Sequence, residues 1–262
     1  RNVVPILLEG LRRLEYRGYD SSGIAVLNRS SELQRVRAIG KIKNLEAKIQ
    51  QDETVISGPV GIAHTRWATH GVPSENNAHP HICNNRVAVV HNGIIENYQA
   101  LKTDQQAAGY QFTSETDTEV IAHALHQQLE NTDDLLKALT QAIKCFEGAY
   151  ALGVVAINDP ETLVVARKGS PLVIGVGIGE HFIASDVSAL LPVTQRFMFL
   201  EEGDVAKITR ETVEIYNEKG ESVERVIKQS SLKSNAVELG EHKHYMHKEI
   251  FEQPQAVSDT LE

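Results

Sequence analysis

We predict an α+β fold with antiparallel sheets, because the two halves of the sequence have different apolar patterns. Before Gly148, apolar residues recur mainly at three- and four-residue spacing, which is typical of amphipathic helices. From Gly148 onward, short runs of Val, Ile and Leu dominate, which is typical of strands. The connections between these runs are short, as at 217–220, and short connections join antiparallel neighbours. A helix-rich half followed by a strand-rich half favours an α+β fold over a doubly wound one.

The bulk composition narrows the class of protein. The chain has 262 residues, 41% of them hydrophobic, which suffices for one large domain or one domain plus part of another. A net charge of −9 argues against nucleic acid or an anionic membrane as a partner. We see no signal peptide and no apolar run that could span a bilayer, and only two cysteines. We therefore expect a cytoplasmic protein, whose natural start lies before Arg1.

The first half should contain five helices and three strands. We expect helices over 4–14, 41–51, 94–109, 120–129 and 134–146, and strands over 24–27, 60–63 and 86–90. Pro5 is tolerated in the first turn of its helix. Arg17 follows the first helix, where its charge can offset the helix dipole.

The second half should contain strands over 149–157, 162–166, 171–176, 181–184, 197–200, 205–208, 213–216 and 223–227, with a short helix over 186–191. The polar segment 229–241 is typical of a linker. In 242–262, Met246, Ile250 and Phe251 begin a new apolar face, which we interpret as the start of a following domain.

The segment 64–71, His-Thr-Arg-Trp-Ala-Thr-His-Gly, places costly polar side chains directly after a predicted buried strand. The planar guanidinium of Arg66 suits a carboxylate. Trp67 can cover a small ligand, and Thr69 and His70 add hydrogen-bonding groups beside Arg66. The alternative is a surface ion pair of Arg66 beside a core tryptophan.

Two further motifs carry groups that suit the same kind of ligand. Asn92 and Gly93 follow the strand over 86–90, where a turn would expose an amide NH₂ and a main-chain N–H as oxyanion donors. A plain turn is the alternative. Thr116 and Glu119 have capping-box spacing, which places Asp117 in the first helical turn. Asp117 could bind an ammonium group or merely offset the helix dipole.

The histidines and cysteines suggest neither a metal centre nor a nucleophile. His79 and His81 are closely spaced, as are His242, His244 and His247, but no cysteine pair or carboxylate accompanies either group at a ligand spacing. Cys83 and Cys145 have no base at a recognisable local spacing, and we expect Cys145 to be a buried structural thiol.

Arg66 and Asp117 together suit the two ends of a free α-amino acid, and Asn92 with Gly93 suits acyl transfer at its far end. A glutamine amide is the natural candidate substrate.

The motifs at 14–21, 64–71, 77–81, 91–97, 114–119 and 244–254 resemble the glutaminase domain of glutamine–fructose-6-phosphate aminotransferases, the glucosamine-6-phosphate synthases. These are class II glutamine amidotransferases with an N-terminal-nucleophile fold, a four-layer α/β/β/α sandwich of two antiparallel sheets. The resemblance implies that Arg66 binds the α-carboxylate of glutamine and Asp117 its α-ammonium. Asn92 and Gly93 would form the oxyanion hole.

The resemblance also implies that Thr69 and His70 line the pocket. Trp67 would lie on the covering loop and gate the ammonia path to the sugar site, and Arg17 would lie near the active site. Residues 1–228 would be the glutaminase domain, 229–241 the linker, and 242–262 the start of a sugar isomerase domain. That domain would use the ammonia to convert fructose 6-phosphate to glucosamine 6-phosphate, the first step of amino-sugar synthesis, and would form a homodimer. No cofactor or metal is implied.

The family's nucleophile is an N-terminal cysteine in a short Cys-Gly-Ile strand ahead of the first helix. The sequence does not include that strand, so we expect residues 1–262 alone to be inactive. The alternatives are another class II amidotransferase, with a phosphoribosyl or aspartyl acceptor, and a non-catalytic glutamine sensor.

Overall fold

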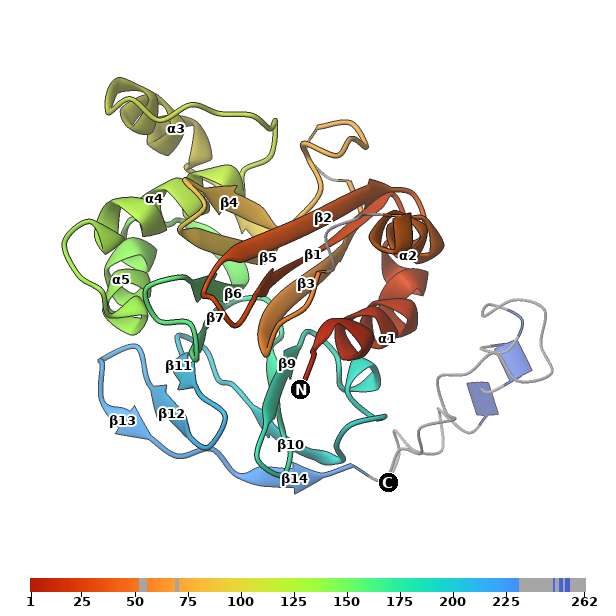
Figure 1. The fold of residues 1–262 in the computed structure, drawn as a ribbon. Helices are drawn as coiled ribbons and strands as arrows, with labels where there is room; N and C mark the ends of the chain where they lie inside the picture. Colours follow the sequence, from red (N-terminus) through yellow and green to blue (C-terminus); the bar gives the residue numbers. More distant parts are fainter. Residues whose placement is uncertain (52–55, 69–70, 231–246, 248–249, 252, 255–262) are drawn as a thin grey trace.

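The computed structural model describes residues 1–51, 56–68, 71–230, 247, 250–251 and 253–254. The three-stranded and seven-stranded sheets lie between helical layers (Figure 1), as the resemblance implies, and a four-stranded sheet is present in addition to the two expected. Helices α1 (Val4–Leu14) and α2 (Ile42–Gln51) cover one side, and α3 (Tyr98–Ala107), α4 (Glu119–Leu129) and α5 (Leu135–Ala142) lie on the other. No helix in the described part of the chain is long and apolar enough to cross a membrane.

A three-stranded antiparallel sheet packs against α1 and α2, in the order β2 (Leu33–Ile39), β1 (Ser21–Leu27), β3 (Val60–Arg66). The central strand β1 is buried along its whole length, because helices cover one face and another sheet covers the other. The sequence prediction missed β2, in which buried Val36 and Ala38 alternate with Arg35 and Arg37. Both arginines donate to main-chain carbonyls of the segment 76–80.

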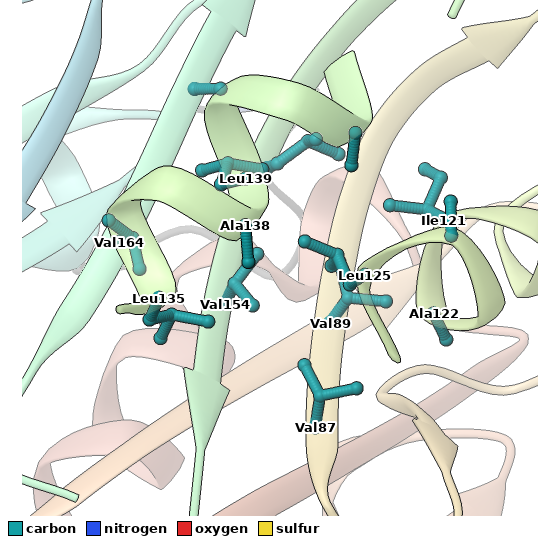
Figure 2. Close-up of a cluster of buried hydrophobic side chains, with 14 of the residues drawn as sticks. Val87, Val89, Ile121, Ala122, Leu125, Leu135, Ala138, Leu139, Val154 and Val164 are labelled. Carbon is teal, nitrogen blue, oxygen red and sulfur yellow. The ribbon is translucent and has the colours of Figure 1, made fainter. Parts of the chain in front are cut away.

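A seven-stranded antiparallel sheet forms the second layer. Its order is β13 (Ser222–Val223), β12 (Val213–Tyr216), β11 (Val205–Ile208), β7 (Leu163–Lys168), β6 (Gly148–Ala156), β5 (Val87–Ile95), β4 (His81–Cys83). Odd-numbered residues of β5, such as Val87 and Val89, pack against α4 and α5 (Figure 2). Even-numbered residues, such as Ala88, point to the three-stranded sheet, as the period of two requires.

The rest of the strand-rich half forms a four-stranded antiparallel sheet. Its order is β14 (Ile227–Gln229), β10 (Arg196–Phe199), β8 (Val173–Val176), β9 (His181–Ala184). The helix expected over 186–191 is a single 3₁₀ turn, η3 (Val187–Ala189). The buried carboxylate of Asp204 accepts two hydrogen bonds of 2.8 Å from Arg225, which fixes the approach to β14. Most of the predicted linker 229–241 and following segment 242–262 lies outside the described residues, so that division stays a prediction.

The turn expected at Asn92 and Gly93 is wrong. Strand β5 continues to Ile95 and stays paired with β6, and helix α3 begins at Tyr98 instead of residue 94. Gly93 has a φ of +128°, and a Cβ there would clash with the main-chain oxygen of Ala149. This glycine therefore allows two strands to approach closely, which a turn prediction from Asn-Gly does not consider.

The capping box expected at Thr116 and Glu119 is also wrong. Helix α4 begins at Glu119, and the Thr116 hydroxyl lies 3.1 Å from His81 Nε2. The buried Glu119 carboxylate instead accepts hydrogen bonds from the main chain and hydroxyls of Thr113 and Ser114. Asp117 consequently lies before the helix, and its role as a first-turn charge is excluded.

Candidate active site

One cleft brings together most of the residues that the sequence singled out. It has a volume of about 1290 Å³ and lies between α1, β3 and the ends of β5 and β6. Its lining includes Arg17, Arg66, Trp67, Asn92, Gly93 and Asp117. Thr69 and His70 lie outside the described residues. Six of the eight predicted site residues therefore share one cavity.

Strand β3 places polar groups in the cleft by alternation. Ile62 packs between the two sheets beside Ala88 and Val155. Because side chains two residues apart share a face, His64 and Arg66 point into the same space farther along the strand. Ala63 faces the opposite way, against the core under α1. The gap between the sheets is thus apolar at Ile62 and polar at the end of β3.

The guanidinium of Arg66 is held inside the cleft, with a side chain only 6% exposed. Its Nη2 donates to the carbonyl of Gly71 at 3.3 Å, and its Nη1 lies 3.8 Å from Asp20 Oδ1. Asp20 also accepts a hydrogen bond from the amide of Ala68. The alternative of a surface ion pair is therefore wrong.

Trp67 is 60% exposed at the mouth of the cleft, so it is not a core residue. Its ring and that of Tyr19 form a T-shaped pair with centroids 5.4 Å apart. Arg17 also lies at the mouth, where Nη1 pairs with Asp186 at 3.1 Å. The Arg17 side chain is half exposed in this ion pair.

Asp117 is buried opposite β5, with 5% exposure. Its Oδ2 accepts a hydrogen bond of 2.8 Å from the amide of Ile95, which joins the segment before α4 to the end of β5. Asn92 lies on β5 three residues earlier, and its Oδ1 is 2.8 Å from His64 Nε2. A buried cation, a buried carboxylate and an amide donor therefore line one cavity, which suits a zwitterionic amino acid with a polar end group.

A family model described as a glutamine amidotransferase domain matches residues 64–192, which contain these groups. The chain belongs to the glutamine amidotransferase family.

Curated relatives match the amidotransferase chain over its whole length. Proteins named glutamine–fructose-6-phosphate aminotransferase [isomerizing] are 55% identical over 262 residues in Shewanella oneidensis and 57% identical over 261 residues in Haemophilus ducreyi. The chain spans 42% of the length of each.

Solved structures confirm the predicted N-terminal-nucleophile fold. The glutamine phosphoribosylpyrophosphate amidotransferase from Bacillus subtilis has a TM-score of 0.68 at 25% identity, over 81% of this chain and 46% of that one. A glutamine aminotransferase class-II domain protein from Silicibacter pomeroyi has a TM-score of 0.51 at 19% identity, over 76% of this chain and 91% of that one, which supports the fold alone.

Four histidines of the amidotransferase domain form a contiguous group beside Asn92, which the sequence prediction missed. His79, His81 and His91 are buried, and His64 lines the cleft. Burial lowers the pKa of His64 to about 4, and it lowers the pKa values of His79 and His81 well below their usual range. All three are therefore neutral at pH 7. In the described ranges, no three His, Cys, Asp or Glu residues are arranged to hold a metal ion.

A second polar group of the amidotransferase domain imitates a catalytic triad. Cys83 Sγ lies 3.2 Å from His123 Nδ1, and His123 Nε2 lies 3.8 Å from Glu119 Oε1. All three side chains are buried between α4 and β4, away from the cleft. Burial raises the pKa of the Cys83 thiol to about 12. Cys145, expected to be buried, is exposed and donates to the carbonyl of Ala142.

Proposed function

We propose that this domain binds L-glutamine and releases its amide nitrogen as ammonia. One observation carries the proposal: buried Arg66 and Asp117 line the same cleft as Asn92 and Gly93. The guanidinium of Arg66 forms a fork for the α-carboxylate, and the carboxylate of Asp117 accepts the α-ammonium. Asn92 Nδ2 and Gly93 N stabilise the negative charge that develops on the amide oxygen.

The nucleophile in this proposal is the N-terminal cysteine used by class II amidotransferases. Neither Cys83 nor Cys145 lines the cleft. Within the described residues, β3 is one of the two edge strands of its sheet and runs along the cleft, so a short strand carrying that cysteine could pair there. Its thiol adds to the amide carbon, the α-amine transfers the proton, ammonia leaves, and water hydrolyses the resulting thioester.

We further propose that the whole protein uses this ammonia to convert fructose 6-phosphate to glucosamine 6-phosphate through a following isomerase domain. The naming of relatives 55% identical over the whole chain supports this acceptor. Dimerisation through that domain, gating of ammonia by Trp67, and cytoplasmic location stay predictions. The similarity to the B. subtilis enzyme supports one other acceptor, phosphoribosylpyrophosphate.

The test compares the full-length protein with a polypeptide of residues 1–262 alone. We expect the full-length protein to release glutamate from glutamine and to form glucosamine 6-phosphate when fructose 6-phosphate is supplied. The polypeptide alone should release no glutamate. A full-length protein that binds glutamine without hydrolysing it would instead be a sensor, and product from phosphoribosylpyrophosphate would change the acceptor.

A further inference from the structure

We propose that His64 is a positioning residue, which donates from Nε2 to Asn92 Oδ1 and so turns the amide nitrogen of Asn92 toward the substrate. The inference rests on the proposed glutaminase function and adds to it a residue that does not itself touch the reacting atoms. The two atoms lie 2.8 Å apart, which is a normal hydrogen-bond distance.

The bond joins strands of two different sheets. His64 lies on β3 of the three-stranded sheet and Asn92 on β5 of the seven-stranded sheet. Both point into the gap between the sheets, because both continue the alternation set by Ile62 and Ala88. The bond therefore crosses the gap between the two sheets at the polar end of β3, beside Arg66.

The protonation of His64 follows from its partner. A side-chain amide oxygen can only accept, so Nε2 must carry the hydrogen in this pair. The pKa of His64 is lowered to about 4 by burial, so at neutral pH the ring has one hydrogen only. With that hydrogen on Nε2, Nδ1 is unprotonated, and it is buried without a hydrogen-bond partner among the described residues.

The orientation of the Asn92 amide has a direct chemical consequence. With Oδ1 bound to His64, Nδ2 is the group turned away from the ring and available to a ligand in the cleft. The flipped amide would present its oxygen to a developing oxyanion, which repels it. An Asn side chain without a fixed partner can adopt either orientation, so a donor on His64 is needed to select the productive one.

The ring of His64 is itself held in place. It stacks on His79 with centroids 4.2 Å apart and planes 18° apart. His79 Nδ1 accepts a hydrogen bond of 3.3 Å from the amide of His91, and its Nε2 lies 3.3 Å from Thr118 Oγ1. The stack therefore fixes the plane in which His64 Nε2 points at Asn92.

A matched pair of variants in the full-length protein tests the assignment. A Gln amide places an N–H near the Nε2 position of histidine, whereas an Asn amide places it near the Nδ1 position. We expect His64→Gln to keep most of kcat for glutamine and His64→Asn to lose about tenfold or more, with KM changed far less. A general loss of folding would move both parameters and the melting temperature in both variants.

A double-mutant cycle makes the coupling explicit. In an Asn92→Ala background, His64→Asn should cause little additional loss, because the group that it positions is gone. Losses that multiply, or a His64→Gln variant no better than His64→Asn, would overturn the inference.

A readout without turnover separates this inference from the proposed function. In full-length protein labelled with ¹⁵N-histidine, long-range ¹H–¹⁵N spectra should show the Nε2–H tautomer for His64. The Nδ1–H tautomer would overturn the assignment even in an active enzyme. A wild-type protein that releases no glutamate would overturn the glutaminase proposal, and with it the catalytic use of this bond.

Discussion

Two groups of polar residues in this domain contrast sharply in access to solvent. Cys83, His123 and Glu119 have the order of a nucleophile, a base and an orienting carboxylate, but they are buried between α4 and β4. Arg66, Asn92 and Asp117 include no nucleophile, but they line an open cleft of about 1290 Å³. Judged by residue types alone, the first group would be the candidate active site. Access to a ligand identifies the second group instead.

The difference arises from what burial does to each group. Burial and the charge of Glu119 raise the pKa of Cys83 to about 12, so its reactive thiolate is essentially absent at neutral pH. Arg66 and Asp117 are also buried, but each keeps a polar partner and faces the cavity. A charged ligand that enters the cleft can bind both of them, and no ligand can reach Cys83.

The largest expected effect comes from removing a substrate-binding charge of the cleft group. Arg66→Ala or Asp117→Ala in the full-length protein should raise the KM for glutamine sharply. A ligand charge left unpaired in a desolvated site costs about 2–5 kcal/mol. Steady-state glutaminase kinetics measure this effect. Arg86→Ala, which removes a partly buried arginine outside the cleft, is the control. Unchanged KM in both cleft variants would contradict their assignment.

The next largest effect distinguishes the two groups directly. Asn92→Ala should lower kcat by about a hundredfold, as the loss of an oxyanion donor does elsewhere. Cys83→Ala should leave kcat and KM for glutamine unchanged, since Cys83 does not line the cleft. A decrease in kcat of only a few fold for Asn92→Ala, or a large decrease for Cys83→Ala, would contradict the assignment of the cleft group as the active site.

A smaller effect concerns stability in acid. The pKa of folded His64 is about 4, below its ordinary value of 6.5, so between these values the unfolded chain binds a proton that the folded chain does not. This difference lowers the free energy of unfolding as pH drops from 7 to 5. His64 contributes about 1–2 kcal/mol to this loss, allowing for the water that reaches its ring from the cleft. Urea unfolding at both pH values, compared with His64→Gln, measures that contribution; equal losses in the two proteins would exclude it.

The smallest effect concerns thiol chemistry. Cys83 should react with iodoacetamide only when the protein unfolds, whereas exposed Cys145 should react in the native state. Mass mapping of the labelled cysteines before and after addition of denaturant checks this order. Rapid native labelling of Cys83 would mean that the triad-like group is accessible after all.

The sequence revealed the parts of the site whose chemistry is local. The segment 64–71 was conspicuous because it puts an arginine and two histidines after an apolar run, and Arg66 does lie in the cleft. Strand β2 was missed because Arg35 and Arg37 interrupt its apolar residues. Both arginines bind main-chain carbonyls of a segment about forty residues later, which the local sequence does not reveal.

Other features depend on contacts that no local pattern contains. The bond from His64 to Asn92 joins residues 28 positions apart on two sheets. Glu119 looked like part of a capping box, but its carboxylate is taken by Thr113 and Ser114. The Asn-Gly pair at 92–93 looked like a turn because the neighbouring strand, which requires a glycine there, is more than fifty residues away.

Gly93 also has a consequence for how the site can change in evolution. Its contribution to the proposed oxyanion hole is a main-chain N–H, which every residue except proline possesses. A mutation cannot remove that donor while keeping the strand intact, since any larger residue would collide with Ala149. The side-chain donor of Asn92, in contrast, can be removed by a single substitution that keeps the strand. In relatives that lose activity by drift, we therefore expect substitutions at Asn92 or His64 before any at Gly93.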